Sequence, residues 1–249
     1  GKNPMTLLAG LGATSAVLML VFKDTITGLA AGVRLTSNDM LHKGDWITVK
    51  SVDANGIVED MSLTTVKVRN FDNTIVTISP ITLVNGSFQN WIGMQKSGGR
   101  RVKRVVYFDF RSVRLVDETL KRNLLAKHFA TEDSFKLKES LQKAIDKDIQ
   151  EGKDIEDLKN PAALAPTNLQ LYRKFMEKYL RQRPEVNTDL TLMVRHMEAT
   201  QCGLPIEFYF FIKDKVWVNY EHILADIMEH AYALANEFGL KIYEQYPEQ

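Results

Sequence analysis

Apolar and small residues occupy the first part of the chain without interruption. No charged residue occurs from Met5 to Phe22, and a run of about 18 residues is near the shortest helix that can cross a bilayer. No basic region precedes the run and no small-residue cleavage site follows it, so its layout is not that of a signal peptide. We predict a membrane-spanning helix; the alternative is a buried core helix of a soluble enzyme.

Small residues recur in this helix and indicate that it packs against other helices. Small side chains let helix backbones approach closely in a membrane, whereas a helix that faces only lipid has no need of them. We expect contacts with copies of the same helix or with other spans, made by Ala9, Gly12 and Ala13. A span of this composition suits a pore wall.

The segment that follows is also predicted to be helical. Ile26, Leu29 and Val33 recur at helical spacing, and Asp24 can cap the N-terminus of a second helix. The pattern leaves two alternatives, a kink near Lys23 and Asp24 or one continuous helix. We expect the second half to lie at the membrane–water interface.

Residues from about 43 to 91 predict short β-strands joined by turns. Apolar and polar residues alternate with period two in Thr65–Arg69, and a second strand follows over Thr74–Ile78. Asn55-Gly56 is typical of a hairpin turn. Asp72-Asn73 turns the chain between the two strands, and Pro80 ends the second of them. Together these short strands predict a small barrel or half-barrel of about five strands.

The rest of the chain predicts an α+β domain. Strands are expected over Val102–Phe110, Leu190–Val194, Ile206–Ile212 and Leu240–Tyr243. Apolar residues at helical spacing mark four helices. The first is marked by Val116, Leu120 and Leu124, and the second by Leu137, Leu141 and Ile145. The third is marked by Leu171, Phe175 and Tyr179 between Thr167 and Pro184, and the fourth by Tyr220 through Phe238 before Gly239. This order predicts a ferredoxin-like sheet with an insertion at about 131–186.

Composition and charge exclude only a few classes of function. Of the 249 residues, 45% are hydrophobic and 25% are charged, which is ordinary for a folded chain. The 32 basic and 31 acidic residues give a net charge of +1, so affinity for nucleic acid or anionic lipid would need a local patch. The single cysteine, Cys202, excludes an intramolecular disulfide.

Sequence motifs of catalysis and cofactor binding are lacking. The chain has no P-loop, no HExxH and no GxSxG motif. His222, Asp226 and His230 follow one another along one helix and could hold a metal, but an exposed polar face explains them better. Cys202 has no cue for a paired histidine, and Glu59-Asp60 most simply faces solvent. We therefore expect no enzyme activity, no cofactor and no metal site.

One local excess of positive charge follows the β-segment, and we interpret it as a linker between domains. Three interpretations of this charge are open: a linker that is charged for solubility, a positive lining for a cytoplasmic vestibule, or RNA binding through backbone phosphates. No aromatic residue interleaves with it for base stacking, so we expect no nucleic-acid partner. The run consists of Lys96, Arg100, Arg101, Lys103 and Arg104.

Six short segments, in this order, carry a resemblance to a known family. They are Gly28–Gly32, Lys43–Ile47, Gly56–Asp60, Thr64–Arg69, Asp72-Asn73 and Ser79-Pro80. Their order and spacing resemble the small-conductance mechanosensitive channel (MscS) family, and more closely its YbdG-type miniconductance members. The YbdG-type resemblance extends to Thr191–Arg195, Gly203–Glu207 and Val216–Leu240.

The resemblance implies three parts and a ring-shaped oligomer. Residues 1–41 would form the pore-lining transmembrane helix and an interfacial helix, 42–92 an Sm-like β-barrel domain, and 93–249 a cytoplasmic α/β domain. A homoheptamer in the bacterial inner membrane, in contact with membrane lipids, would open under tension. It would pass ions and small solutes during hypo-osmotic shock. The alternative function is a membrane-anchored Sm-like module that binds RNA or protein.

The resemblance also implies roles for residues of the first helix. Aligned with the family's pore helix, Ala16 and Leu20 occupy the two constriction positions, and Leu20 is the larger. Lys23, the first charge after the apolar run, and Asp24 would lie at the pore mouth. The competing assignment has Leu18 or Met19 facing the axis.

Two departures from the family pattern bear on these roles. Ile81 follows Pro80 where members often carry Asn. The kink glycine of the best-known members aligns with Asp24, which implies a stiffer or differently placed hinge. The other transmembrane helices of the family are expected to precede residue 1.

Overall fold

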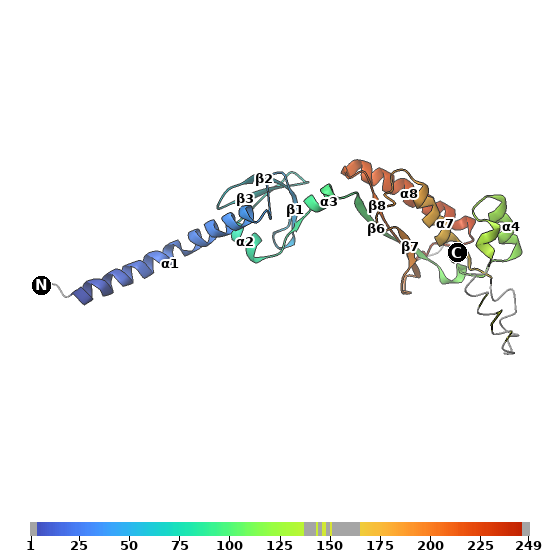
Figure 1. The fold of residues 1–249 in the computed structure, drawn as a ribbon, viewed down its shortest axis with the longest axis horizontal. Helices are drawn as coiled ribbons and strands as arrows, with labels where there is room; N and C mark the ends of the chain where they lie inside the picture. The colour runs from blue at the N-terminus through green and yellow to red at the C-terminus, as the bar shows by residue number, and fades with distance from the viewer. Residues whose placement is uncertain (1–3, 137–142, 144–145, 148–149, 151–164, 246–249) are drawn as a thin grey trace. The chain divides into compact units, whose positions relative to one another are not determined.

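The computed structural model describes residues 4–136, 143, 146–147, 150 and 165–245 (Figure 1). The chain divides into two compact units, residues 1–96 and 97–249. The helix predicted from Leu137, Leu141 and Ile145 is marked by residues outside the described ones. Each unit is considered by itself.

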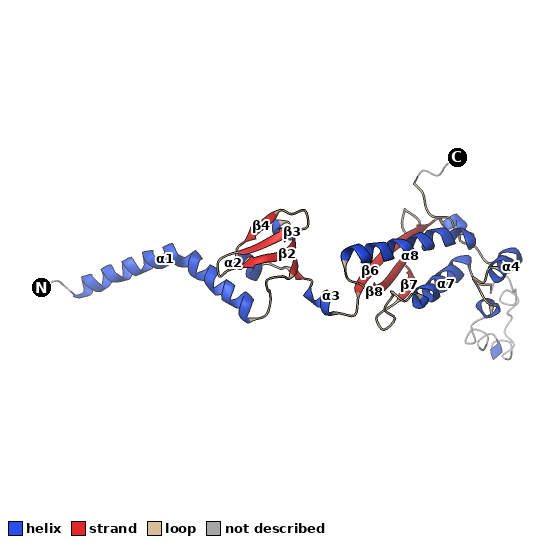
Figure 2. Ribbon diagram, turned by 90° about the horizontal axis from the view of Figure 1, so that it is seen from above, coloured by secondary structure: helices blue, strands red, loops and turns tan. Residues whose placement is uncertain are grey.

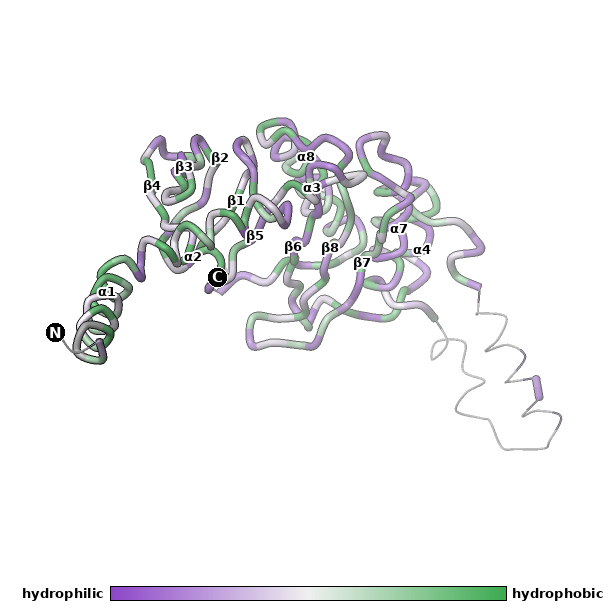
Figure 3. The backbone as a smooth tube through the Cα atoms, turned by 60° about the vertical axis from the view of Figure 1, so that its left-hand side comes forward, coloured by the Kyte–Doolittle hydropathy of each residue, from purple (hydrophilic) through white to green (hydrophobic). Residues whose placement is uncertain are grey.

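The first unit begins with α1, a single helix of 34 residues over Pro4–Ser37. Of the two alternatives for this region, the structure has the continuous helix. Asp24 lies inside it, so the expected N-cap at Asp24 is wrong: its carboxylate has no helix terminus to satisfy. Figure 3 shows the largely apolar colouring of α1 along its length.

The C-terminal part of α1 packs onto a small β-domain. Ala31 and Leu35 are buried, and Leu35 belongs to the same apolar core as Leu41, Ile47 and Val68. The backbones also touch at one point, because a Cβ placed on Gly32 would overlap the backbone oxygen of Leu63. Only glycine permits this approach.

The β-domain is an antiparallel sheet of five strands in the order β4-β3-β2-β1-β5. Alternate residues of its strands point into the core, as the period-two pattern predicted. The elements are β1 Trp46–Val49, the 3-10 turn η1 Lys50–Val52, β2 Ala54–Met61, β3 Val66–Asn70, β4 Ile75–Ile78, α2 Pro80–Asn85, β5 Gln89–Asn90 and α3 Ile92–Lys96.

The predicted turn at Asn55-Gly56 is wrong. Both residues lie inside β2, and the β1–β2 turn is made by η1 with Asp53 in the left-handed region at φ 51°. Gly56 serves close approach, since a Cβ there would overlap the backbone oxygen of Arg69 on β3. The turn at Asp72-Asn73 is confirmed, with Asn73 at φ 70°. Pro80 ends the strand region as predicted and begins α2.

The second unit is a sheet in the order β6-β8-β7, with helices packed against it (Figure 2). Alternate residues of β8, including Ile206, Phe208 and Phe210, share one core with residues of α7 and α8. The bounds are β6 Arg100–Phe108, the 3-10 turn η2 Phe110–Ser112, α4 Glu118–Ala126, the 3-10 turn η3 Glu132–Phe135, α7 Asn168–Gln182, β7 Met193–His196, β8 Leu204–Ile212 and α8 Trp217–Glu237.

The ferredoxin-like prediction is confirmed by this order. Phe108 at the end of β6 makes an isolated antiparallel bridge to Ile242, so the last segment lies beside β6, on the side away from β8. The spatial order is then last segment, first, third and second strand, the arrangement of the βαββαβ motif. The predicted fourth strand is limited to that one bridge.

Polar side chains cap two helices of this unit, α7 and α4. Thr167 caps α7 by accepting a hydrogen bond from Gln170 N, as predicted, and Asp117 caps α4 by accepting one from Leu120 N. Asn168, fully buried, donates from Nδ2 to the backbone oxygens of Ser112 and Phe238 and accepts at Oδ1 from Arg114 N. One side chain thus joins α7 to the loop after β6 and to the end of α8.

The contact between α1 and Leu63 yields a stability prediction. Gly32→Ala is expected to lower the free energy of unfolding by about 1–3 kcal/mol, because the backbones must separate to admit the new methyl group. Gly28→Ala is the matched control: nothing lies within 4 Å of its Cβ position, and alanine favours a helix over glycine by about 1 kcal/mol. Thermal unfolding followed by tryptophan fluorescence measures both. Equal melting of the two variants would contradict the predicted contact.

Candidate functional site: the N-terminal helix

Most of α1 has no covering within the chain. The segment Leu8–Ser37 is the one helix, among the described residues, that is long and apolar enough to cross a membrane. Its most apolar window has a mean hydropathy of 1.6, and only 11% of that window is buried. A core helix of a soluble protein would be mostly buried. Large exposed side chains include Leu8, Leu11, Val17, Leu18, Met19, Leu20, Val21 and Phe22.

The exposed part of α1 has two faces that differ in size of side chain. Because the helix is continuous, ideal helical geometry gives the relative direction of every side chain. One arc of about 100° holds the predicted packing and constriction residues. The opposite side holds large apolar side chains. The first set is Ala9, Gly12, Ala13, Ala16 and Leu20, with Lys23; the second is Leu11, Leu18, Phe22 and Leu29.

Within the first face, Ala16 and Leu20 lie near the middle. They are one turn apart, and Leu20 is 73% exposed. Gly12 and Ala13 lie toward the two flanks of the same arc. In a ring of helices, the middle of such an arc can face the axis while its flanks contact the two neighbours. Leu18 and Met19 lie off this arc.

The glycines of α1 divide into two kinds. Among the described residues, nothing lies within 4 Å of a Cβ placed on Gly10, Gly12 or Gly28, whereas Gly32 is needed for the contact with Leu63. Gly12 therefore has no role in the contacts that the described part of the chain makes with itself. A glycine in mid-helix costs about 1 kcal/mol relative to alanine, and close approach of another helix would offset that cost.

Two threonine hydroxyl groups of α1 form hydrogen bonds within the helix. Thr14 Oγ1 donates to the backbone oxygen of Gly10 at 2.8 Å, and Thr27 Oγ1 to that of Lys23 at 2.7 Å. Neither of these two hydroxyl groups therefore needs water as a partner, which suits an apolar surrounding.

Lys23 and Asp24 are the first charges after the apolar run, and both are exposed. Within the described part of the chain neither forms an ion pair. On the helix Lys23 shares the face of Ala16 and Leu20, whereas Asp24 lies about 100° further round. Adjacent copies of the helix could therefore bring Asp24 of one copy toward Lys23 of the next.

The basic run is not a linker, which corrects the sequence interpretation. Four of its five residues lie in β6, and only Ser97–Gly99 separates α3 from that strand. Arg100 lies 4.3 Å from the ring centre of Tyr220, and Arg101 lies 6.0 Å from that of Tyr209. Lys103 lies 3.6 Å from the buried carboxylate of Glu207. The charges are thus part of the folded sheet.

Glu207 is a residue that sequence reasoning missed. Its side chain is fully buried on β8, and Arg195 Nε donates to Oε2 at 2.6 Å. The signal was present: Glu207 is the only charged residue in the otherwise apolar and aromatic Leu204–Ile212. A buried carboxylate requires a partner of opposite charge, and Arg195 on the neighbouring strand supplies it.

The other candidate residues belong to elements other than α1. His230 Nδ1 lies 2.8 Å from the backbone oxygen of Asp226, and its ring stacks on Tyr179. Cys202 is exposed in the turn between β7 and β8. Glu59 pairs with Arg69 across β2 and β3 at 2.6 Å. These contacts are those of a folded surface.

Comparison with known proteins identifies the middle of the chain. Residues 24–93 match the family described as "Mechanosensitive ion channel, beta-domain". This range covers the C-terminal part of α1, the five-stranded sheet and the start of α3. The match therefore includes the helix–sheet contact at Gly32.

Curated relatives include two channels of Methanocaldococcus jannaschii. The chain is 34% identical over 90 residues to the small-conductance mechanosensitive channel MscMJ, covering 36% of this chain and 25% of the relative. It is 30% identical over 134 residues to the large-conductance channel MscMJLR, covering 53% of this chain and 36% of the relative. The chain thus spans about a quarter to a third of these relatives.

Solved structures share the fold over nearly the whole chain. The closed-state MscS of Helicobacter pylori superposes with a TM-score of 0.60 at 12% identity, covering 100% of this chain and 74% of that one. MSL1 of Arabidopsis thaliana gives a TM-score of 0.63 at 10% identity, covering 97% of this chain and 66% of that one. Residues 24–93 of this chain are thus similar to the β-domain of mechanosensitive ion channels, and the chain as a whole shares its fold with the MscS of Helicobacter pylori.

Proposed function

We propose that this chain is the pore-forming and cytoplasmic part of a tension-gated ion channel. The observation that carries the proposal is a long apolar helix, uncovered by its own chain, that is held at its C-terminal end by a mechanosensitive-channel β-domain. The exposed apolar surface must meet lipid or other helices. No catalytic step is needed for this function.

A ring of identical helices explains the two faces of α1. The face of small residues allows neighbouring backbones to approach, and the face of Leu11, Leu18, Phe22 and Leu29 offers a broad apolar surface to lipid or outer helices. We infer a homo-oligomer, and the family resemblance favours seven copies. The arrangement puts the soluble units on one side of the membrane, which we assign to the cytoplasm of a bacterial inner membrane.

Leu20 is the proposed hydrophobic seal. Ala16 is too short to close a ring, so a ring of Leu20 side chains would form the narrower constriction. Water is poorly held in an apolar tube, so such a pore is non-conducting without being fully occluded. If the open state covers more membrane area, tension favours it by the product of tension and area change, because the two states then differ in free energy under load.

Solute release under hypo-osmotic shock follows from that gate. Swelling raises membrane tension, the pore wets and widens, and ions and small solutes leave until tension falls. Patch recording under applied suction tests the proposal. The full-length protein in a membrane should pass current only above a threshold of suction; a protein that instead binds RNA and never conducts would support the alternative of an anchored Sm-like module.

The oligomer is expected to be a heptameric ring. Native mass measurement of the full-length protein in detergent should give seven copies, and Gly12→Leu should shift the mass toward smaller species, because a large side chain separates the helices. Gly10→Leu is the control, since Gly10 lies off the small-residue face and equally has nothing within 4 Å. A clean monomer or dimer of the wild type would refute the ring.

Leu20→Ser should open the channel at lower tension or make it leak. The hydroxyl holds water in the constriction, and each copy loses up to about 2 kcal/mol of apolar transfer free energy that opposes wetting. Suction thresholds of single channels and the growth of expressing cells measure the effect. Leu18→Ser and Met19→Ser are matched controls on other faces. If either control leaks while Leu20→Ser gates normally, the wrong face has been assigned to the axis.

Lys23→Gln should shift ion preference toward cations. A ring of ammonium groups at the pore mouth repels cations, and substitution by glutamine removes that charge while keeping a polar side chain only slightly shorter than lysine. The reversal potential in asymmetric salt measures the change. A Lys43→Gln channel, altered at an exposed lysine just before the β-domain, serves as the charge-matched control. An unchanged reversal potential in Lys23→Gln would place Lys23 outside the ion path.

A further inference from the structure

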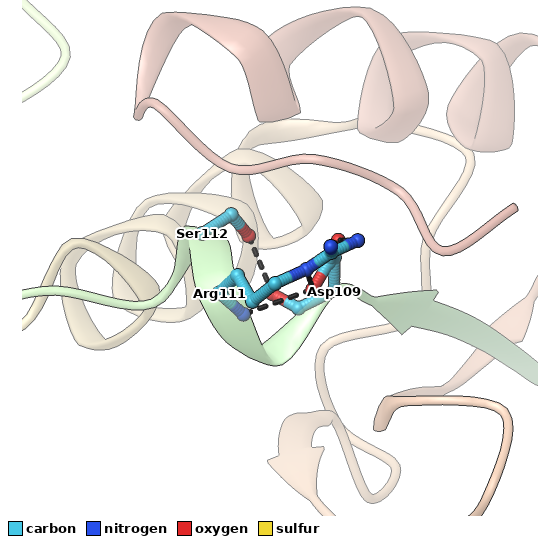
Figure 4. Close-up of polar contacts among 3 residues, drawn as sticks. All are labelled: Asp109, Arg111 and Ser112. Atoms are coloured by element: carbon cyan, nitrogen blue, oxygen red, sulfur yellow. Dashed lines mark hydrogen bonds and ion pairs between the residues drawn. The ribbon is translucent and has the colours of Figure 1, made fainter. Parts of the chain in front are cut away.

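The second unit has two clefts whose lining residues are described, and they differ in how their charges are used. The larger, of about 760 Å³, is lined by Asp109, Arg111, Arg114 and Lys241 among others. In Figure 4 the Arg111 side chain folds back onto Asp109, with Nη2 donating to Oδ2 at 2.7 Å. This pairing lowers the pKa of Asp109. Arg114 pairs with Asp117 at 3.0 Å, so both arginines already have carboxylate partners.

The smaller cleft, of about 380 Å³, lies between α7 and the segment that follows α4. Its lining has two parts. The first is apolar and aromatic: Phe129, Ala130, Leu171, Phe175 and Tyr179. The second is polar: His128, Thr131, Ser134, Lys174, Lys178 and Gln182. None of these lining residues is acidic.

The apolar wall is held firmly by the core of the unit. Phe129 and Phe175 meet edge to face with ring centres 5.3 Å apart, and both lie against Phe238. Phe238 is fully buried. Edge-to-face aromatic pairs have a preferred geometry, so the wall is a formed surface that a flat ring could pack against.

The positive charges at this cleft have no carboxylate partner in the described part of the chain. Lys174 and Lys178 are both exposed and lie one helical turn apart on α7, so their ammonium groups repel each other. The nearby Glu177 does not relieve this, because it pairs with Arg181 at 3.0 Å. A bound anion would relieve the repulsion.

We propose that this cleft binds an aromatic monoanion, a ring that carries one carboxylate or sulfonate group. The ring would lie against Phe129 and Phe175, and the anionic group would meet Lys174 and Lys178. A volume of about 380 Å³ is at the small end of ligand pockets, which suits a molecule of one or two rings. The inference stands on the geometry of this cleft and does not depend on channel activity.

The test uses the full chain in detergent, with 4-fluorobenzoate as the probe and the width of its fluorine NMR signal as the readout. Empty micelles give the baseline. Wild-type protein should broaden the signal in a saturable way, and unlabelled benzoate should restore it. Benzyl alcohol, which lacks the charge, and inorganic phosphate, which lacks the ring, should not displace the probe at the same concentration.

Paired variants separate this site from general binding of anions. The double variant Lys174→Gln/Lys178→Gln should bind at least about tenfold more weakly, because charge-assisted hydrogen bonds are lost. Lys43→Gln/Lys67→Gln removes the same charge from exposed lysines of the other unit and should bind like the wild type. Absence of saturable binding would overturn the proposal. So would an unaffected Lys174/Lys178 variant, or displacement by phosphate as effective as that by benzoate.

Discussion

The contact of α1 with the β-domain at Gly32 is the constraint on which the rest of the first unit depends. Ala31 and Leu35 are buried beside it, so one side of the helix is fixed against the sheet over its last turns. Because α1 is continuous, fixing that end also fixes the rotation of every residue toward the N-terminus. The direction of Leu20 is thus set by a contact about three turns away.

A continuous helix also changes how the proposed gate would work. In a helix with a kink at Lys23, the apolar half could tilt while the second half stayed on the β-domain. Here the helical hydrogen bonds run through Lys23 and Asp24, and Thr27 adds a bond back to the Lys23 carbonyl. Movement of the apolar N-terminal half of α1 would therefore change the packing around Ala31, Gly32 and Leu35. In this conformation we therefore expect α1 to move as one rigid helix and not to bend at a local hinge.

Much of the fold could be predicted, because strong periodicity decides where elements form. The helix after Thr167, the strand Leu204–Ile212 and the long helix before Gly239 follow directly from spacing and caps. The prediction of a turn at Asn55-Gly56 failed because glycine occurs both in tight turns and where two backbones approach closely. Gly56 belongs to the second case, since it allows the close approach of β2 to β3. The interpretation of the basic run as a linker was wrong because it gave charge more weight than alternation: the strand predicted from Val102 already contained Lys103 and Arg104, and Val102 and Val106 carry its pattern.

The residues of the candidate site can be proposed from the sequence, but their geometry cannot. Small residues between Ala9 and Ala16 are visible in the sequence, yet the orientation of their face relative to the β-domain depends on whether the helix bends near Lys23 and Asp24. The structure also separates two kinds of glycine that the sequence cannot distinguish. Gly32 and Gly56 are required by backbones of this same chain, whereas Gly10, Gly12 and Gly28 have open space beside them. Glycines of the second kind weaken an isolated helix, so their presence in an exposed apolar helix is best explained by contacts that other helices complete.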